Sequence, residues 1–169
     1  RSTEKEWNEY YSEGYYDRFH RPRPVQNCEN KGSNSDVGAL TFKRIKQYLL
    51  INEKCHDITL KGNRVCEIGA GNGDVISSFS GNELCAIEPS EECQDVLKKK
   101  GISIVLNSTD QAKNSNYKFE IILMRHVLEH VYYPKNFLKT VRDLLTDKGI
   151  MYIAVPNIFV SDRTFTSMF

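Results

Sequence analysis

Three glycines at two-residue spacing are the feature of this sequence that points most directly to ligand chemistry. Gly69, Gly71 and Gly73 follow an apolar run in the segment RVCEIGAGNGD, which covers residues 64–74. A backbone rich in glycine can approach a ligand closely and adopt the positive φ that a tight turn between a strand and a helix needs. Glu67 lies just ahead of the glycines and adds a negative charge. The segment therefore predicts a small-molecule site at a strand-to-helix turn.

Two classes of ligand compete for such a turn. A dinucleotide site needs the spacing G-x-G-x-x-G, with the diphosphate at a helix N-terminus. In this sequence the third glycine comes one residue early and Asp74 follows it. Glu67 and Asp74 would repel a diphosphate in a partly desolvated site, whereas they would attract the sulfonium and ammonium groups of S-adenosylmethionine. The spacing therefore favours S-adenosylmethionine, and an NAD-type oxidoreductase remains the alternative.

A second carboxylate, Glu88, follows the next apolar run, LCAI. At the end of a strand it can accept hydrogen bonds from both hydroxyls of a ribose. Dinucleotide sites share this feature, so Glu88 supports an adenosine ligand of either class.

A third group of polar residues, His126, Glu129 and His130, lies in the segment RHVLEHVYYP. Their spacing would place them on one side of a helical turn. A histidine titrates near neutral pH and can remove a proton from a hydroxyl acceptor. His130 is the better candidate base and His126 the second. The alternative is structural, with Glu129 and His130 tying the turn to neighbouring backbone.

The elements that must position these residues alternate between strands and helices. We expect strands over residues 64–70, 84–88, 102–106, 119–125 and 150–155, and helices over residues 3–11, 36–49, 74–80, 91–100 and 134–146, with Asp36 as an N-cap and Gly149 closing the last helix. Strands that are nearly continuous apolar runs are typical of a parallel sheet covered on both faces. Ligands bind at the carboxyl ends of such strands, where each of the motifs falls.

Composition limits the function classes. The 169 residues are 40% hydrophobic and 27% charged, with 23 Lys and Arg against 22 Asp and Glu, a net charge of +1. This balance gives no reason to expect duplex nucleic acid as a partner. No apolar stretch approaches the ~20 residues of a membrane span, and no signal segment opens the chain. The five cysteines form no C-x-x-C pair, which favours reduced, mostly buried thiols in a cytoplasmic protein.

Residues 1–35, rich in aromatic and polar side chains, form either a lid or a segment packed on the body, and residues 36–169 form the ligand-binding domain.

The motifs occur in the order typical of one family. EIGAGNG resembles the E/D-x-G-x-G-x-G motif of class I S-adenosylmethionine-dependent methyltransferases, AIEPS resembles their ribose-binding strand end, and the stretch from HVLEHVYYP to VPN is similar to their fourth and fifth strands. The resemblance covers residues 63–157. It implies an α/β fold, a Rossmann-like three-layer α/β/α sandwich with a mainly parallel sheet, whose usual C-terminal part is missing. It also implies S-adenosyl-L-methionine as cofactor and S-adenosyl-L-homocysteine as product.

Carried over position by position, the resemblance implies a set of cofactor contacts. These are Glu67, Gly69, Ala70, Gly71, Gly73, Glu88, Pro89, Asn107, Ser108, Arg125 and His126. The glycines would face the methionine part, Glu88 the ribose, and Asn107 and Ser108 the adenine. Arg125 departs from the family pattern. A cation beside a sulfonium is unfavourable, so Arg125 must point away, pair with an acid or serve an anionic substrate.

The resemblance leaves the methyl acceptor open. A small polar molecule is expected, by default through a hydroxyl of a sugar, a glycan or lipid precursor or another metabolite, and a non-catalytic cofactor-binding interaction domain is the second alternative. Small-RNA 2′-O-methyltransferases place metal ligands on a similar turn. They have a glutamate where His126 stands and need a further histidine near the fifth strand, which residues 158–169 lack. No metal is therefore expected.

Overall fold

The structure is a computed structural model that describes residues 34–51 and 61–156, together with Thr3 and Lys5. The helix expected over residues 3–11 and the candidate lid fall almost entirely outside these described residues. No helix among the described residues is long and apolar enough to cross a bilayer.

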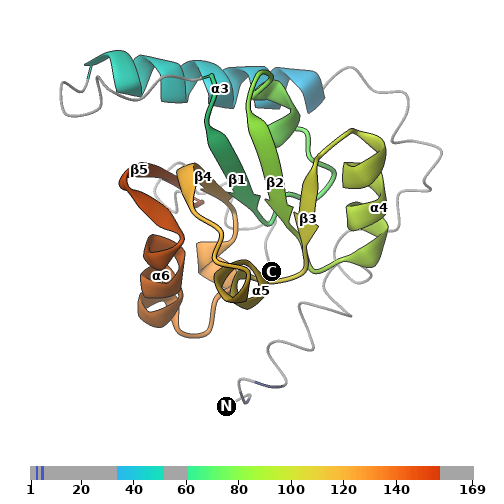
Figure 1. Ribbon diagram of the computed structural model, residues 1–169, viewed down its shortest axis with the longest axis vertical. Coiled ribbons are helices and arrows are strands. Elements are labelled where there is room, and N and C mark those ends of the chain that lie inside the picture. The colour runs from blue at the N-terminus through green and yellow to red at the C-terminus, as the bar shows by residue number, and fades with distance from the viewer. Residues whose placement is uncertain (1–2, 4, 6–33, 52–60, 157–169) are drawn as a thin grey trace, which may run out of the picture.

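A five-stranded parallel sheet forms the centre of the domain (Figure 1). Its strands are β1 (Arg64–Ile68), β2 (Glu83–Ile87), β3 (Ile104–Leu106), β4 (Phe119–Arg125) and β5 (Leu145–Ala154). The order across the sheet is β3-β2-β1-β4-β5, and every pair is parallel. The chain builds outward from β1 to β3 on one side and from β4 to β5 on the other. The strand order therefore switches between β1 and β4, which is where such sheets bind ligands.

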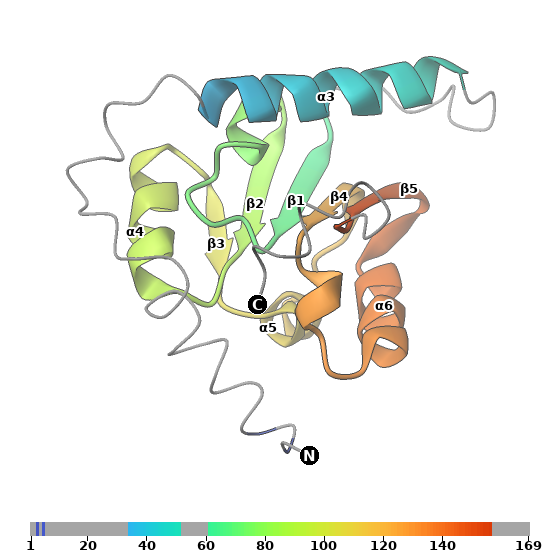
Figure 2. The ribbon, with the colours of Figure 1, turned by 180° about the vertical axis from the view of Figure 1, so that it is seen from behind.

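Helices and short 3-10 turns cover both faces of the sheet, as the view from behind also shows (Figure 2). They are α3 (Asn34–Ile51), η4 (Ile76–Ser78), α4 (Glu91–Lys99), α5 (Thr109–Asn114), η5 (Leu128–His130) and α6 (Pro134–Asp143). On one face α5 and α6 pack against Cys66, Ile68 and Ile122, and on the other α3 and η4 pack against Val65 and Leu123. This arrangement confirms the predicted three-layer α/β/α sandwich.

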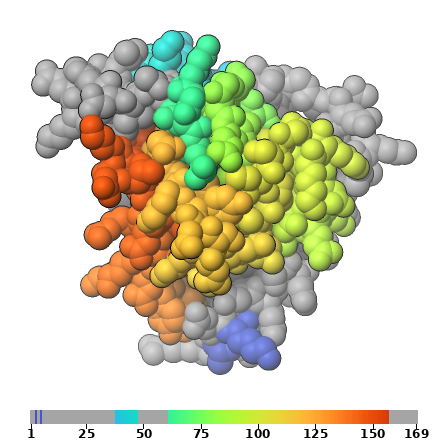
Figure 3. Space-filling model, in the orientation of Figure 1, coloured from blue at the N-terminus to red at the C-terminus, as the bar shows by residue number. Residues whose placement is uncertain are grey.

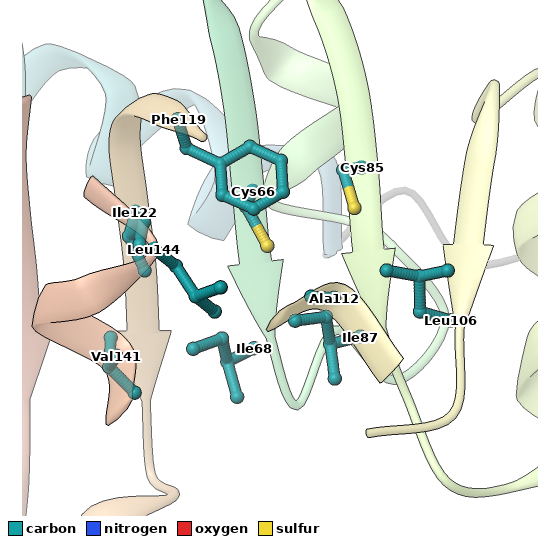
Figure 4. Packing of buried hydrophobic residues seen from close by; sticks show 10 residues of the cluster. All are labelled: Cys66, Ile68, Cys85, Ile87, Leu106, Ala112, Phe119, Ile122, Val141 and Leu144. Carbon is teal, nitrogen blue, oxygen red and sulfur yellow. The ribbon is translucent and has the colours of Figure 1, made fainter. Parts of the chain in front are cut away.

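The largest buried cluster includes two thiols that face each other across β1 and β2 (Figure 4). Cys66 and Cys85 are register partners on neighbouring strands, and both are fully buried, free thiols. Burial raises the pKa of Cys66 well above its usual value, and the neighbouring Cys85 raises it further. A thiol that stays protonated behaves as a small apolar side chain, so this pair contributes to packing.

Two expectations about the helices are wrong, and one helix was missed. Residues 74–80 form a turn and the 3-10 segment η4 instead of a helix, because serines compete for backbone hydrogen bonds and lower helix propensity. The hydroxyl of Ser77, for example, donates to the carbonyl oxygen of Gly73 at 2.6 Å. Helix α3 begins at Asn34, so Asp36 lies inside the helix and is not its N-cap. The short helix α5 was not expected; the side chain of Ser108 caps it.

The boundary between α6 and β5 also differs from the expectation. Helix α6 ends at Asp143, and β5 begins at Leu145, so the expected helix end at Gly149 is wrong. The register between β4 and β5 shifts in this region, since Phe119 pairs with Leu145 while Ile121 pairs with Ile150. A Cβ atom at Gly149 would lie 2.9 Å from the carbonyl oxygen of Phe119. Glycine is therefore required by the close approach of two strands.

Candidate functional site

The candidate functional site lies at the carboxyl ends of the strands on both sides of the switch point. The glycine turn (Gly69–Gly73) follows β1, Glu88 follows β2, Arg125 ends β4 and His126 follows it. Because the strands are parallel, their carboxyl ends lie at the same end of the sheet (Figure 1). The site residues lie at this end. In the space-filling view the segments from β1 through α5 form one continuous surface (Figure 3). The sheet thus brings together motifs that are far apart in the sequence.

The three glycines of the turn are needed for different reasons. A Cβ atom at Gly69 would lie 2.4 Å from Cγ2 of Val127, and one at Gly73 would lie 2.6 Å from Cδ2 of Leu97. These two glycines are required by packing inside the protein. A Cβ atom at Gly71, whose φ is +52°, would meet nothing within 4 Å in the described part of the chain. Gly71 is therefore the position at which the backbone is open to an approaching ligand.

Glu88 is a buried carboxylate that joins two segments of backbone. It is 1% exposed. Its Oε2 accepts a hydrogen bond from the N–H of Gly71 at 2.8 Å, and its Oε1 accepts one from the N–H of Ser90 at 3.0 Å. Burial raises the pKa of Glu88, and these two N–H groups oppose the rise. Each carboxylate oxygen has a second acceptor position, so the group can still receive hydroxyl donors from a ligand.

Glu67 lies on β1 below the turn and is 3% exposed. Its Oε2 accepts a hydrogen bond from the N–H of Ile76 at 2.9 Å. Burial raises the pKa of Glu67 to about 8, while the Ile76 N–H and the charge of Arg125 act against the rise. At neutral pH most of the Glu67 population is therefore protonated. A cationic group bound nearby would favour the ionised form.

The other charged residues around the turn are arranged differently from what the sequence suggested. Asp74 forms an ion pair with Lys100 at 2.8 Å, so its charge is partly neutralised at the end of α4. Arg125 favours the ionised form of Glu67 electrostatically. In the described part of the chain it makes no direct ion pair with a carboxylate. The three options for Arg125, that it points away, pairs with an acid or serves an anionic substrate, stay predictions.

The histidine turn after β4 is not the single helical turn that the spacing predicted. His126 adopts a φ of +53°, a conformation that non-glycine residues rarely adopt, and its N–H donates to the carbonyl oxygen of Ala154 at 2.9 Å. The 3-10 turn η5 begins only at Leu128. Nδ1 of His126 lies 3.4 Å from Oε1 of Glu129. Strained backbone of this kind clusters at functional sites, which keeps His126 a candidate.

His130 ends η5 and is partly buried. Burial lowers its pKa; Glu129 opposes this effect and His126 adds to it. The imidazole is therefore neutral at pH 7. A neutral imidazole can accept a proton, so the structure gives His130 the protonation state that a general base needs.

The predicted adenine contacts lie at the carboxyl end of β3. The N–H of Asn107 donates to Oε1 of Gln111 at 2.9 Å, and Oγ of Ser108 accepts from the N–H of Gln111 at 3.2 Å. Ser108 is thus already used as the N-cap of α5. Pro89 is exposed beside Glu88. The roles of these residues and of Ala70 toward a cofactor stay predictions.

Sequence reasoning missed two residues that support the site. Nε2 of Gln94 donates to the carbonyl oxygen of Glu88 at 2.7 Å, and the side chain of Val127 packs over Gly69. Neither residue carries a local pattern that separates it from other helix or turn residues. Among the described residues, no group of His, Cys, Asp and Glu is arranged to hold a metal ion.

Glu67→Gln tests the unusual protonation of Glu67. Between about pH 4.5 and 8 the folded protein holds a proton on Glu67 that the unfolded chain has lost, because the folded pKa is the higher one. The free energy of unfolding of the wild type should therefore fall as pH rises through this window, by up to about 1.4 kcal/mol per pH unit from this group. The variant lacks this contribution, so its stability relative to the wild type should rise with pH in urea unfolding.

Glu83→Gln is the matched control, since Glu83 starts the neighbouring strand with an exposed side chain. Its stability relative to the wild type should change little between pH 5 and 8. If the free energies of unfolding of Glu67→Gln and the wild type changed with pH in parallel, Glu67 would not titrate in this range.

Comparisons with known proteins agree with this geometry. The sequence model of a family described as a methyltransferase domain matches residues 41–168. The ubiquinone biosynthesis O-methyltransferase of Coxiella burnetii is 28% identical over 108 residues, which cover 59% of this chain and 46% of the relative. The chain thus spans about half the length of the curated relatives it matches.

Two solved structures are similar to this chain, and the first of them shows the same fold. The first is the plantazolicin methyltransferase BpumL in complex with a pentazolic desmethylPZN analogue and S-adenosylhomocysteine (SAH). It matches with a TM-score of 0.64 at 16% identity, and the match covers 90% of this chain and 62% of that protein. The plantazolicin methyltransferase BamL, in complex with a triazolic analogue and SAH, is 29% identical with a TM-score of 0.48, covering 53% of this chain and 36% of that protein.

Proposed function

Because this chain belongs to the family of methyltransferase domains, we propose that it binds S-adenosylmethionine at the glycine turn and transfers its methyl group to a hydroxyl of a small polar acceptor. Family membership confirms the resemblance found in the sequence and favours methyl transfer over the oxidoreductase alternative. The observation that carries the proposal is the meeting of an open Gly71 and a buried Glu88 at the carboxyl ends of β1 and β2, beside the switch point. A domain boundary near residue 36 stays a prediction.

The residues at the strand ends fit this cofactor. A ligand can lie against Gly71, where no side chain of the described residues fills the space. Glu88 retains acceptor capacity for the two ribose hydroxyls, which need an acceptor at the end of the second strand. Glu67 offers a carboxylate whose ionised form a cation would favour. The site thus supplies backbone and negative charge, which suit a cationic nucleoside better than a diphosphate.

His130 is the proposed general base, and His126 is the second candidate. The bound cofactor would supply an activated methyl group on a sulfonium, so the protein must align the acceptor and remove its proton. His130 is neutral at pH 7 and can take that proton. His126, close to Glu129, would orient the turn or share in this role.

Two observations support the proposed acceptor, one for its hydroxyl group and one for a ring. The Coxiella relative is named as an O-methyltransferase. Next to the histidine turn, Tyr132 and Tyr133 are exposed and meet edge to face, with ring centroids 4.6 Å apart. Such rings can pack against the flat face of a sugar or an aromatic acceptor. We therefore propose a hydroxylated ring compound of small size.

Thermal unfolding with different ligands tests the proposed cofactor. S-adenosylmethionine and S-adenosylhomocysteine, each at ~100 times its dissociation constant, should add about 2.7 kcal/mol of stability. For a domain of this size the midpoint should rise by roughly 5–10 °C. NAD should have no effect. A shift with NAD and none with the sulfur ligands would contradict the proposal. Binding without turnover of any hydroxyl acceptor would favour a non-catalytic binding domain.

A further inference from the structure

The carboxylate of Glu88 forms a bridge between the glycine turn and the start of α4. One oxygen accepts from the N–H of Gly71 and the other from the N–H of Ser90. The backbone of Glu88 is itself fixed, because its N–H donates to Leu106 at 2.8 Å and its carbonyl oxygen accepts from Gln94 at 2.7 Å. A carboxylate whose backbone is fixed in this way can fix the positions of the Gly71 and Ser90 N–H groups in turn.

Only a carboxylate can make this bridge at position 88. Its two oxygens both accept, so each can face a backbone N–H. A glutamine has a single acceptor oxygen, and its NH₂ group would face one of the two N–H donors. An aspartate can reach the N–H two residues ahead, as in an Asx turn, but its shorter side chain moves the carboxylate away from Gly71. The position of Gly71 thus depends on a full-length carboxylate.

We propose that Glu88 is a positioning residue for the glycine turn, which gives it control over binding of the amino-acid part of the cofactor in addition to the ribose. The inference rests on the proposed function, because it assumes that the open side of Gly71 receives the methionine part. A ribose contact alone would make Glu88 important only for the nucleoside. A bridge to Gly71 makes it important for the part of the ligand that Glu88 itself does not touch.

Amide hydrogen exchange of the ligand-free protein tests the bridge directly. In Glu88→Asp the amide of Gly71 should exchange about 10- to 100-fold faster than in the wild type, because a hydrogen bond to a charged acceptor is lost. In Glu88→Gln the amide of either Gly71 or Ser90 should exchange faster, depending on which of the two faces the NH₂ group. The amide of Gly73, which donates to the carbonyl oxygen of Ala70 at 2.8 Å, is an internal reference. Glu83→Gln, at the start of the strand that Glu88 follows, should leave both amides unchanged. Unchanged exchange at Gly71 in folded Glu88→Asp would overturn the proposal.

Ligand affinity provides the second test. S-adenosylhomocysteine carries the amino-acid part, whereas methylthioadenosine carries only the nucleoside and the sulfur. Both should lose affinity in Glu88→Asp and Glu88→Gln, but the ratio of their association constants should fall about tenfold at the expense of S-adenosylhomocysteine. Equal losses for the two ligands would overturn the positioning role. If the wild type bound neither ligand, the proposed function would fail, and the exchange result would still decide the bridge.

Discussion

Gly71→Val is expected to abolish binding of S-adenosylhomocysteine and to leave the domain folded. A Cβ atom at this position meets no atom of residues 34–51 or 61–156 within 4 Å, so the isopropyl group would occupy space that these residues leave open. If the cofactor lies against this backbone, the side chain takes its place. The affinity should fall by more than about 100-fold. A ligand displaced by the valine side chain would also lose its hydrogen bonds to the rest of the site.

The matched control for this variant is Gly101→Val. Gly101 has a φ of +80° and, like Gly71, open space around its Cβ position. Both substitutions therefore carry a similar backbone penalty of about 1–2 kcal/mol, which a thermal unfolding curve measures. Only the Gly71 variant should lose the ligand in isothermal titration calorimetry. Loss of binding in both variants would attribute the effect to destabilisation, and retained binding in Gly71→Val would place the cofactor elsewhere.

His130→Gln should lower the turnover number by about 10²- to 10⁴-fold and leave the affinity for S-adenosylhomocysteine unchanged. This range is typical of the loss of a general base. Radiolabelled methyl transfer to a panel of sugars and phenols measures turnover, and calorimetry measures affinity. An equal loss of affinity and turnover would show that His130 supports the cofactor site instead of the acceptor.

The pH profile separates the two histidines. The pKa of His130 is lowered by burial, so the neutral base is formed below the ordinary value of 6.5. Turnover should therefore rise with pH on the acid side of 6.5 and be level above it. His126→Asn is the companion variant, because asparagine tolerates the positive φ at this position. The general base is the histidine whose substitution abolishes the rise of turnover with pH below 6.5.

Much of the fold could be predicted because its signals are local. The strands are continuous apolar runs, and α4 begins after the N-cap Ser90 as its boundary residues predicted. The three-layer sandwich follows from the alternation of these elements. The errors lie where local signals are weak, in the serine-rich segment of η4 and in the α6–β5 boundary. There a contact between two strands, at Gly149 and Phe119, decides the structure.

The candidate site shows the same division. Glycine spacing and strand-end acids were enough to select Gly71, Glu67 and Glu88, since backbone freedom and charge are properties of the residues themselves. Their separate tasks were not predictable. The ion pair of Asp74 with Lys100 joins residues that are 26 positions apart in the sequence.

The family, the order of the elements and the residue types at the strand ends can be predicted from the amino-acid order alone. The folded structure is needed to show that Gly69 and Gly73 serve packing while Gly71 stays open, that Glu88 bridges two segments, and that Glu67 holds a proton at neutral pH. These properties depend on clashes, hydrogen-bond partners and desolvation, and therefore on which distant residues meet. That meeting is set by the sheet, in which β1 lies between β2 and β4.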